Sequence, residues 1–180
     1  KKKPGSSISY NLISARAVKE VVEENGGKPL RSRVGHSFIK AMMAESGAIF
    51  GGEHSGHFYF ADFWRADSGM LAALHAIAAL GASDKTLSEL LAPYARYFAS
   101  GEINSQVADS KAIMAGIKES YGSKPGVTTD ELDGLTVDGD TWWFNVRASN
   151  TEPLLRLNVE AKTQSQMEAL RDEVLAVIRG

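Results

Sequence analysis

Cysteine is absent from all 180 residues of the sequence. Disulfide bonds and thiolate metal sites are therefore excluded, and a reducing compartment is expected, which makes the cytoplasm the predicted location. An excess of one charge is lacking too, because acidic and basic residues are interleaved and the net charge is only −2. Such a chain has no long-range attraction to nucleic acid or to an anionic membrane, so neither is expected as a partner.

Long hydrophobic runs are also missing. The longest one, around residues 70–80, is interrupted by His75 and is too short to span a bilayer. No apolar stretch follows Lys1-Lys2-Lys3, so these lysines do not begin a signal peptide, and a start without methionine suggests a fragment or a processed chain. What remains is an ordinary globular composition, 43% hydrophobic and 23% charged, sufficient for one large domain or two small ones.

The first half of the sequence alternates between strand and helix patterns. The β-prone stretches predict strands at residues 6–10, 28–33, 48–50 and 58–60. Helices are predicted from Ser14 to the Asn25-Gly26-Gly27 stop and over residues 37–45, 67–80 and 87–91. The candidate N-caps of these helices are Ser14, Asp67 and Ser68. Short connections between alternating elements are typical of a layered α/β domain, which we place at residues 1–98.

The second half has a different order of elements. Strands are predicted at residues 103–107, 135–137, 141–146 and 154–159, helices at 110–121 and 165–178, and a loop at 122–129. Asp138-Gly139-Asp140 between two β-prone runs indicates a hairpin. The last helix shows Met167, Leu170, Val174 and Val177 at helical spacing, which predicts its buried face. Strands grouped between two helices favour an α+β domain on an antiparallel sheet, at residues 99–180.

One loop, Gly51 to His57, is polar where an ordinary turn would suffice. Its three glycines allow close approach of the backbone to a ligand. Glu53 can accept from two neighbouring hydroxyls and Ser55 can both donate and accept, which suits a vicinal diol on a sugar. Two alternatives stay open: an ordinary glycine-rich hairpin, and a metal site formed by Glu53, His54 and His57. We expect Glu53 at the surface, because burying a structural carboxylate there would be costly.

A second loop, Arg147 to Pro153, joins the last two predicted strands. Arginine offers a planar fork to two phosphate oxygens, and Ser149, Asn150 and Thr151 add side-chain donors. The alternative is an ordinary turn, since Ser, Asn and Thr often bond to their own backbone. A diol-binding loop and a phosphate-binding loop in one small chain together indicate a sugar phosphate as the ligand.

These motifs resemble those of a known family, the α-D-phosphohexomutases. Gly-Glu-His-Ser-Gly-His at residues 52–57 resembles the family's sugar-specificity loop, and Arg-Ala-Ser-Asn-Thr-Glu-Pro at 147–153 resembles its phosphate-binding loop. The segment Arg33–Lys40 is similar to a third family segment, whose histidine faces the active site. The resemblance covers essentially the whole chain and implies the C-terminal half of a four-domain enzyme. It implies an α/β third domain and an α+β fourth domain with a TATA-binding-protein-like fold.

The resemblance also implies roles for individual residues. Sugar hydroxyls would be bound by Glu53 and Ser55, and the active site would be lined by His36 and His57, with His57 the candidate for proton transfer. The phosphate that is not reacting would be held by Arg147, Ser149, Asn150 and Thr151. Where some relatives carry a substrate-facing lysine, this sequence has Ile13, which departs from the family pattern.

Two family loops are absent from the sequence: the one with the phosphorylated serine and the one that holds Mg²⁺. The resemblance therefore implies Mg²⁺ and a hexose 1,6-bisphosphate activator for the whole enzyme, but no metal ligand in this chain. The missing N-terminal domains would be its partners, hexose phosphates its ligands, and the chain alone would be inactive.

The branch of the family is indicated by residues around the second loop. Asn150 argues against the phosphoglucosamine branch, where glycine is usual. Phe144-Asn145-Val146 and Leu155–Glu160 look most like bacterial phosphomannomutases. The resemblance thus implies interconversion of mannose 6-phosphate and mannose 1-phosphate through a hexose bisphosphate and a phosphoserine. The alternatives are a phosphoglucomutase, a dual-specificity enzyme, or a non-catalytic module that only binds sugar phosphates.

Overall fold

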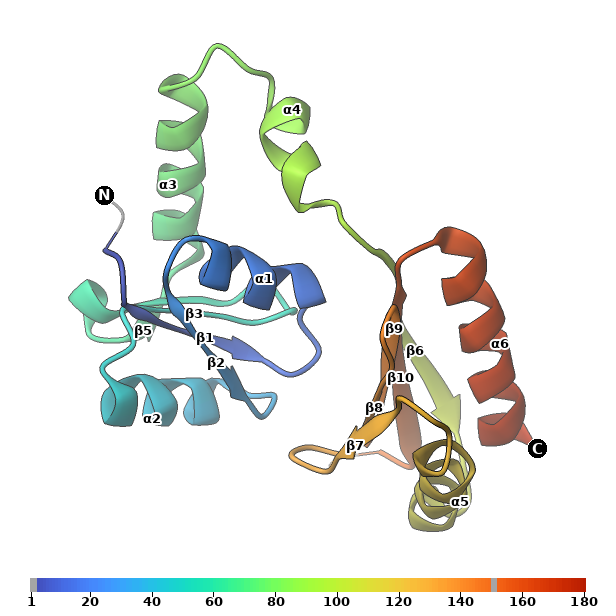
Figure 1. Ribbon diagram of the computed structural model, residues 1–180. Helices are drawn as coiled ribbons and strands as arrows, with labels where there is room; N and C mark the ends of the chain where they lie inside the picture. The colour runs from blue at the N-terminus through green and yellow to red at the C-terminus, as the bar shows by residue number, and fades with distance from the viewer. Residues whose placement is uncertain (1–2, 150–151) are drawn as a thin grey trace. The chain divides into compact units, whose positions relative to one another are not determined.

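The computed structural model describes residues 3–149 and 152–180. They form two compact units, the first ending at Arg96 and the second beginning at Tyr97, and each unit contains one five-stranded sheet (Figure 1). In the part of the chain that the structure describes, no helix is both long and apolar enough to cross a membrane.

The sheet of the first unit is mixed, with the strand order β2-β1-β3-β4-β5. Strand β1 pairs in parallel with β2 and β3, whereas β4 and β5 continue the sheet antiparallel to β3. The strands are β1 (Ser7–Asn11), β2 (Lys28–Ser32), β3 (Phe50–Gly52), β4 (Phe58–Phe60) and β5 (Ala66–Asp67). The α/β class expected for this half is confirmed, but β5 was not predicted.

Helices α1 and α2 cover opposite faces of this sheet (Figure 1). The core on the α2 side contains Ile39, Met43 and Tyr59, and a β-carbon on Gly51 would lie 2.8 Å from Ile39 and 2.9 Å from Met43. Close packing of α2 therefore requires glycine at position 51. The helices of this unit are α1 (Arg16–Glu24), α2 (His36–Ser46), α3 (Gly69–Gly81) and α4 (Leu87–Leu91), with short 3₁₀ turns at Ala61–Phe63 and Ala92–Tyr94.

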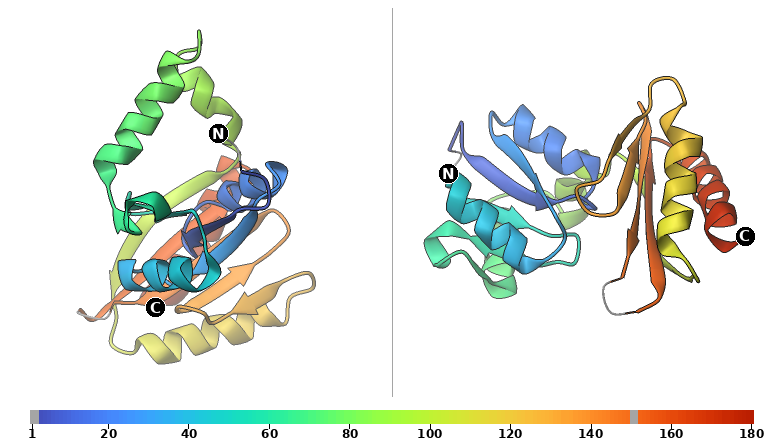
Figure 2. Two further views of the ribbon diagram at one scale, coloured as in Figure 1. Left: turned by 90° about the vertical axis from the view of Figure 1, so that its left-hand side faces the viewer. Right: turned by 90° about the horizontal axis from the view of Figure 1, so that it is seen from below.

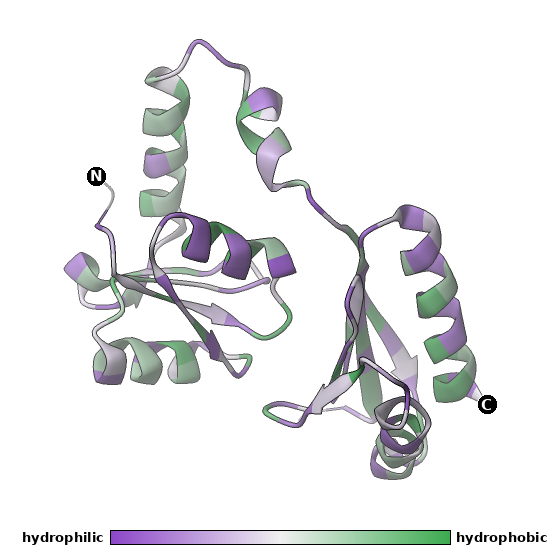
Figure 3. Ribbon diagram, viewed as in Figure 1, coloured by the Kyte–Doolittle hydropathy of each residue, from purple (hydrophilic) through white to green (hydrophobic). Residues whose placement is uncertain are grey.

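Two of the three predicted N-caps are wrong. Helix α1 begins after Ala15, and the Ser14 hydroxyl instead donates to Oδ1 of Asn11 at 2.8 Å. Ser68 does cap α3, accepting from the backbone N–H of Leu71, whereas Asp67 accepts from the N–H of Phe58. Figure 3 shows α3 as a mainly apolar helix, and none of its residues is buried within this unit.

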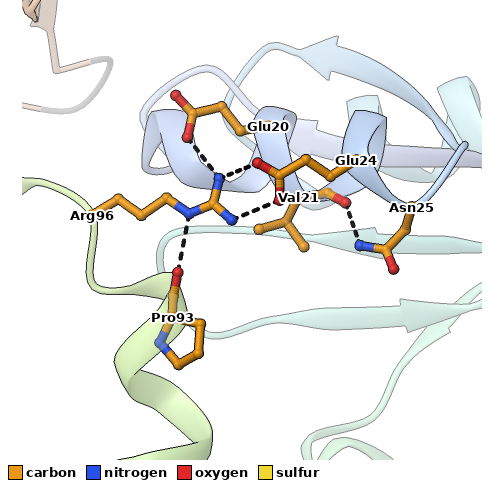
Figure 4. A network of polar contacts seen from close by, with 6 residues as sticks. All are labelled: Glu20, Val21, Glu24, Asn25, Pro93 and Arg96. Atoms are coloured by element: carbon orange, nitrogen blue, oxygen red, sulfur yellow. Dashed lines mark hydrogen bonds and ion pairs between the residues drawn. The ribbon is translucent and has the colours of Figure 1, made fainter.

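Arg96 ties the end of the first unit to α1 (Figure 4). Its guanidinium donates to Glu20 at 3.0 Å and to both carboxylate oxygens of Glu24 at 2.6 and 2.7 Å, while its Nε donates to the carbonyl of Pro93 at 3.0 Å. The hydrogen bond from Arg96 lowers the pKa of Glu24 below its usual value. The Glu24 side chain is 55% exposed, so the ion pair adds little to stability and its main effect is to fix the course of the chain after α4.

The sheet of the second unit is entirely antiparallel, with the order β6-β10-β9-β8-β7. Its strands are β6 (Phe98–Gln106), β7 (Thr128–Asp130), β8 (Leu135–Asp138), β9 (Trp142–Ala148) and β10 (Leu154–Ala161). Two expectations were wrong here. Strand β6 begins at Phe98, earlier than residue 103, and β7 occupies part of the segment predicted as a loop.

Helices α5 (Ser110–Gly122) and α6 (Gln164–Arg179) cover one face of the second sheet (Figure 2). Side chains of β8, β9 and β10 pack with both helices in a single core, so the predicted α+β class is confirmed. The buried face of α6 differs from the prediction at one place: Val177 is 46% exposed, whereas Ile178 is 3% exposed. Ile178 lies one helical turn after buried Val174 and so shares its face. The likeness to the TATA-binding protein stays a prediction.

Candidate functional site

The loop between β3 and β4 is a tight hairpin. The N–H of Glu53 donates to the carbonyl of His57 at 3.0 Å, and the N–H of Gly56 donates to the carbonyl of Glu53 at 3.0 Å. Gly56 has a φ of +82°, which a residue with a side chain adopts at a cost. The turn leaves His54, Ser55 and His57 exposed. The glycines therefore shape a compact loop that presents polar side chains to solvent.

We expected Glu53 at the surface, but the residue is buried and only 8% exposed. Its Oε1 accepts from the backbone N–H of Gly35 at 2.9 Å, and its Oε2 accepts from the hydroxyl of Tyr59 at 2.7 Å. The expectation was wrong because these two donors offset the cost of removing a carboxylate from water. Burial, and then the hydrogen bond to Glu53, raise the pKa of Tyr59 above its usual value, so the phenol stays protonated as a donor.

His57 lies between a hydroxyl and a carboxylate. Its Nδ1 is 2.8 Å from Oγ of Ser55, and its Nε2 is 3.9 Å from Oδ2 of Asp67. The other oxygen of Asp67 accepts from the backbone N–H of Phe58 at 2.9 Å, which holds the carboxylate at the β4–β5 pair. An imidazole held in this way has one ring nitrogen at the hydroxyl of Ser55 and the other facing the negative charge of Asp67. That arrangement suits proton transfer.

The sequence indicated Asp67 only as a helix cap, and its contact with His57 was not predicted. The two residues are brought together by the pairing of Tyr59 with Asp67 between β4 and β5. Strand β5 has only two residues and therefore no periodic signal, so nothing in the sequence pointed to this neighbour.

The segment around His36 is joined to the same loop. His36 is the exposed first residue of α2, and the preceding Gly35 has a φ of +128° and donates to Glu53. On the other side of the loop, the N–H of His54 donates to Oδ1 of Asn11 at 3.3 Å. Asn11 is fully buried and its Nδ2 has no partner among the described residues. Ile13, the departure from the family pattern, is buried at 6% exposure.

A metal centre in this loop has no support from the geometry. Over residues 3–149 and 152–180, no group of three or more His, Asp or Glu side chains is arranged to hold a metal ion. Glu53, whose oxygens face Gly35 and Tyr59, does not converge with the two exposed histidines on a common point.

The second unit carries a cluster of charged side chains on the sheet face opposite α5 and α6. Arg147 at the end of β9 lies directly opposite Arg156 of β10 in the strand register. Glu102 of β6 lies between them: its Oε2 is 3.6 Å from Arg147 and its Oε1 is 3.6 Å from Arg156. Arg156 also donates to Oγ of Ser149 at 3.4 Å. We call Arg147, Arg156, Glu102 and Ser149 the arginine cluster.

The arginine cluster includes two of the four residues predicted to bind phosphate. Arg147 is 9% exposed, and the backbone N–H of Ser149 donates to the carbonyl of Leu154 at 2.8 Å, which helps to close the hairpin. The other two, Asn150 and Thr151, lie outside the described residues, so their role stays a prediction. Glu102 and Arg156 were not predicted from the sequence as members of this cluster. Arg156 lies opposite Arg147 through the strand register, and Glu102 reaches both arginines from β6, where it pairs with Asn158, so no local pattern indicated either residue.

Comparisons with known proteins cover nearly the whole chain. Residues 1–97 match the model of phosphoglucomutase/phosphomannomutase, alpha/beta/alpha domain III, and residues 102–177 match that of the phosphoglucomutase/phosphomannomutase C-terminal domain. The chain is 42% identical over 178 residues to a phosphomannomutase of Methanocaldococcus jannaschii and 38% identical over 180 residues to a phosphomannomutase of Escherichia coli. Each alignment covers 99% of this chain but 39% of the relative, so the chain spans about two-fifths of their length.

A solved structure shows the same arrangement of elements. The phosphoglucomutase/phosphomannomutase family protein of Burkholderia thailandensis superposes with a TM-score of 0.83 at 28% identity. The superposition covers 98% of this chain and 38% of that protein.

Proposed function

This chain belongs to the phosphoglucomutase/phosphomannomutase family, and on that premise we propose that it is the sugar- and phosphate-binding C-terminal half of a phosphomannomutase. The enzyme would interconvert mannose 6-phosphate and mannose 1-phosphate through a hexose bisphosphate. The observation that carries the proposal is the identity of 38–42% to phosphomannomutases along the whole chain. Activity on glucose phosphates, alone or together with mannose phosphates, is the alternative.

Glu53 and Ser55 are proposed to bind the 3- and 4-hydroxyls of the sugar. Glu53 is held in one orientation by Gly35 and Tyr59, and each of its oxygens keeps a lone pair for a further donor. The 3- and 4-hydroxyls lie between the two phosphorylated positions, so they return to nearly the same place when the bisphosphate makes a half-turn. Mannose and glucose differ at the 2-hydroxyl, which such a site does not need to contact.

His57 is proposed to move a proton to or from the sugar oxygen that reacts. Ser55 and Asp67 on either side restrict the orientation of its ring, so that Asp67 acts as a positioning residue. His36, exposed at the start of α2, is proposed to line the same site.

Arg147, Ser149, Asn150 and Thr151 are proposed to hold the phosphate that does not react. The near-complete burial of Arg147 supports this role, because its Nε has no partner among the described residues and is therefore an unused donor for an anion. Binding energy from this remote group helps to position the reacting end of the sugar phosphate.

The phosphoryl-transfer machinery is proposed to lie in the rest of the longer protein. The described residues do not fit a magnesium site, so we assign Mg²⁺, the phosphoserine and activation by a hexose 1,6-bisphosphate to those other domains. Mg²⁺ in such enzymes neutralises charge on the phosphoryl group in transfer. A cytoplasmic location, expected from the cysteine-free composition, remains part of the proposal.

A complementation assay tests this division of roles. The purified chain alone should not interconvert mannose phosphates, whereas the full-length protein should do so with Mg²⁺ and a bisphosphate activator. Adding the N-terminal domains in trans should restore part of the activity. Turnover by the chain alone, free of host enzyme, would contradict the proposal. A full-length protein that binds mannose 1-phosphate but never turns it over would favour the non-catalytic binding module.

A further inference from the structure

Two like charges face each other in the arginine cluster. Arg147 and Arg156 form a directly opposed pair in the antiparallel register of β9 and β10. Their strand neighbours Val146, Leu155 and Leu157 lie in the core beneath α5 and α6, so both arginines point to the opposite face of the sheet. Like charges directly opposite on neighbouring strands are destabilising, so the pair requires a compensating negative charge.

Glu102 is that negative charge. It comes from β6, where it pairs with Asn158, and each of its carboxylate oxygens faces a different arginine at 3.6 Å. These separations allow charge attraction but are too long for good hydrogen bonds. The carboxylate thus bridges the two guanidinium groups without satisfying their N–H donors.

The arginine cluster therefore holds two positive charges against one negative charge. The Nε atoms of Arg147 and Arg156 are buried and have no partner in the described part of the chain. A guanidinium has five N–H donors, so two guanidinium groups side by side have more donors than a single carboxylate can accept. Among the described residues, the cluster lacks a second anion and an acceptor for each of the two Nε atoms, and a phosphate group would supply both.

We propose that Glu102 competes with phosphate for Arg147 and Arg156. In this way it limits how tightly these two arginines, which with Ser149 form what we call the phosphate clamp, hold their ligand. The proposal rests on the proposed function, in which the clamp must bind one phosphate of the sugar, release it, and then bind the other. The carboxylate attracts both guanidinium groups when the clamp is empty and repels the phosphate when it arrives. A clamp without this carboxylate would bind phosphate more tightly but release it more slowly, which would limit turnover.

Titration of this chain with inorganic phosphate and with mannose 1-phosphate tests the proposal. In Glu102→Gln, the loss of one negative charge beside the ligand should tighten both by about fivefold to thirtyfold at low salt. The gain should shrink as the ionic strength rises. Glu102→Ala is a second neutral variant with the same expectation if the glutamine variant does not fold. Glu102→Asp keeps the charge and should bind close to the parent value.

The matched control is Glu119→Gln on α5, an exposed helix residue on the covered side of the sheet. It changes the net charge equally and should leave phosphate binding unaltered. In the full-length protein, Glu102→Gln should lower both KM and kcat. A mere loss of structure would not lower KM. If the parent chain bound neither ligand, the phosphate clamp of the proposed function would fail and this inference with it. If the parent bound both and the neutral variants bound equally or more weakly, only the role of Glu102 would be overturned.

Discussion

The hydroxyl of Tyr59 donates to Oε2 of Glu53 across 2.7 Å, in a pair that is almost fully removed from solvent. Tyr59 is 1% exposed and belongs to the core beneath α2, whereas Glu53 begins the loop that we propose binds the sugar. The bond therefore links the packing of the first unit to the position of the carboxylate that we propose binds the sugar. It also means that Glu53 has a structural role in addition to its proposed role in binding.

Substitutions at these two positions should separate the two roles. Tyr59→Phe and Glu53→Gln should each reduce the free energy of unfolding by about 1–3 kcal/mol, since each disturbs a buried hydrogen bond to a charged group. In the full-length protein, Glu53→Gln should also cause a large fall in kcat/KM, equal for mannose and glucose phosphates. Tyr59→Phe keeps the carboxylate but removes one of the two donors that orient it, so its fall in kcat/KM should be smaller. Urea denaturation and steady-state kinetics measure the two effects.

Tyr94→Phe is the control for this pair, because Tyr94 is 53% exposed. Its stability should match that of the parent. A loss of activity confined to one sugar would show that Glu53 senses the 2-position, and the account based on the half-turn would then be wrong.

Asp67 is expected to act through His57. His57→Ala in the full-length protein should lower kcat by about 10²–10⁴-fold, the usual contribution of a general acid or base. Asp67→Asn removes the charge beside Nε2 and should lower kcat in the same direction but by less, with little change in KM. In the double variant, Asp67→Asn should have no further effect, because the imidazole on which Asp67 acts is gone. Additive losses would show that Asp67 acts independently of His57.

Arg147 is expected to provide binding energy rather than chemistry. Arg147→Ala should weaken binding of mannose 1-phosphate by about 1.5–3 kcal/mol, the size of a charge-assisted hydrogen bond. Lysine should restore this only in part, because it is a point charge without the planar fork. Calorimetric titration gives both values. If Arg147→Ala bound mannose 1-phosphate as tightly as the parent, the loop would be an ordinary hairpin turn with no role in phosphate binding.

Gly134, in the loop between β7 and β8, packs closely against the backbone of Arg147. It has a φ of +70°, and a β-carbon there would lie 2.8 Å from the Cα of Arg147 and would collide with the carbonyl of Val146. Gly134→Ala should therefore destabilise the second unit and weaken phosphate binding. Gly126→Ala is the matched control, since Gly126 has a φ of +74° with no atom within 4 Å of the added carbon. The difference between the two melting temperatures measures the collision alone, and equal values would contradict it.

The second unit should lose stability in acid through Glu173. The hydroxyl of Tyr121 donates to its carboxylate at 2.7 Å, and this bond, followed by the charge of Lys124, lowers the pKa of Glu173 below its usual value. The stabilisation is fully present above that value and is lost as the pH falls through the lower pKa of the folded state. Melting temperatures measured from neutral pH downward should fall less steeply in Glu173→Gln than in the parent. Identical slopes would show that Glu173 does not contribute.

Most helices and strands could be predicted from the sequence because their signals are local. The periodic apolar residues of α6 and the Asp138-Gly139 turn lie within a few neighbouring positions, so the pattern alone indicated the element. Strands β5 and β7 are too short to show a period, and neither contains an aromatic residue, unlike the equally short β4, whose Phe-Tyr-Phe is β-prone. Such short strands exist only because a longer partner strand pairs with them.

The two loops proposed to bind the ligand were likewise visible as motifs, since their glycines, hydroxyls and charges are consecutive in the sequence. Their supporting partners were not. The contacts of Glu53 with Gly35 and Tyr59, and of Glu102 with Arg147 and Arg156, join strands and loops that are separate in the chain. Strand register and helix packing bring these residues together, and no local pattern encodes either. The sequence alone thus determined the elements and the chemical character of the loops, whereas only the tertiary structure decided which charge is buried and what faces it.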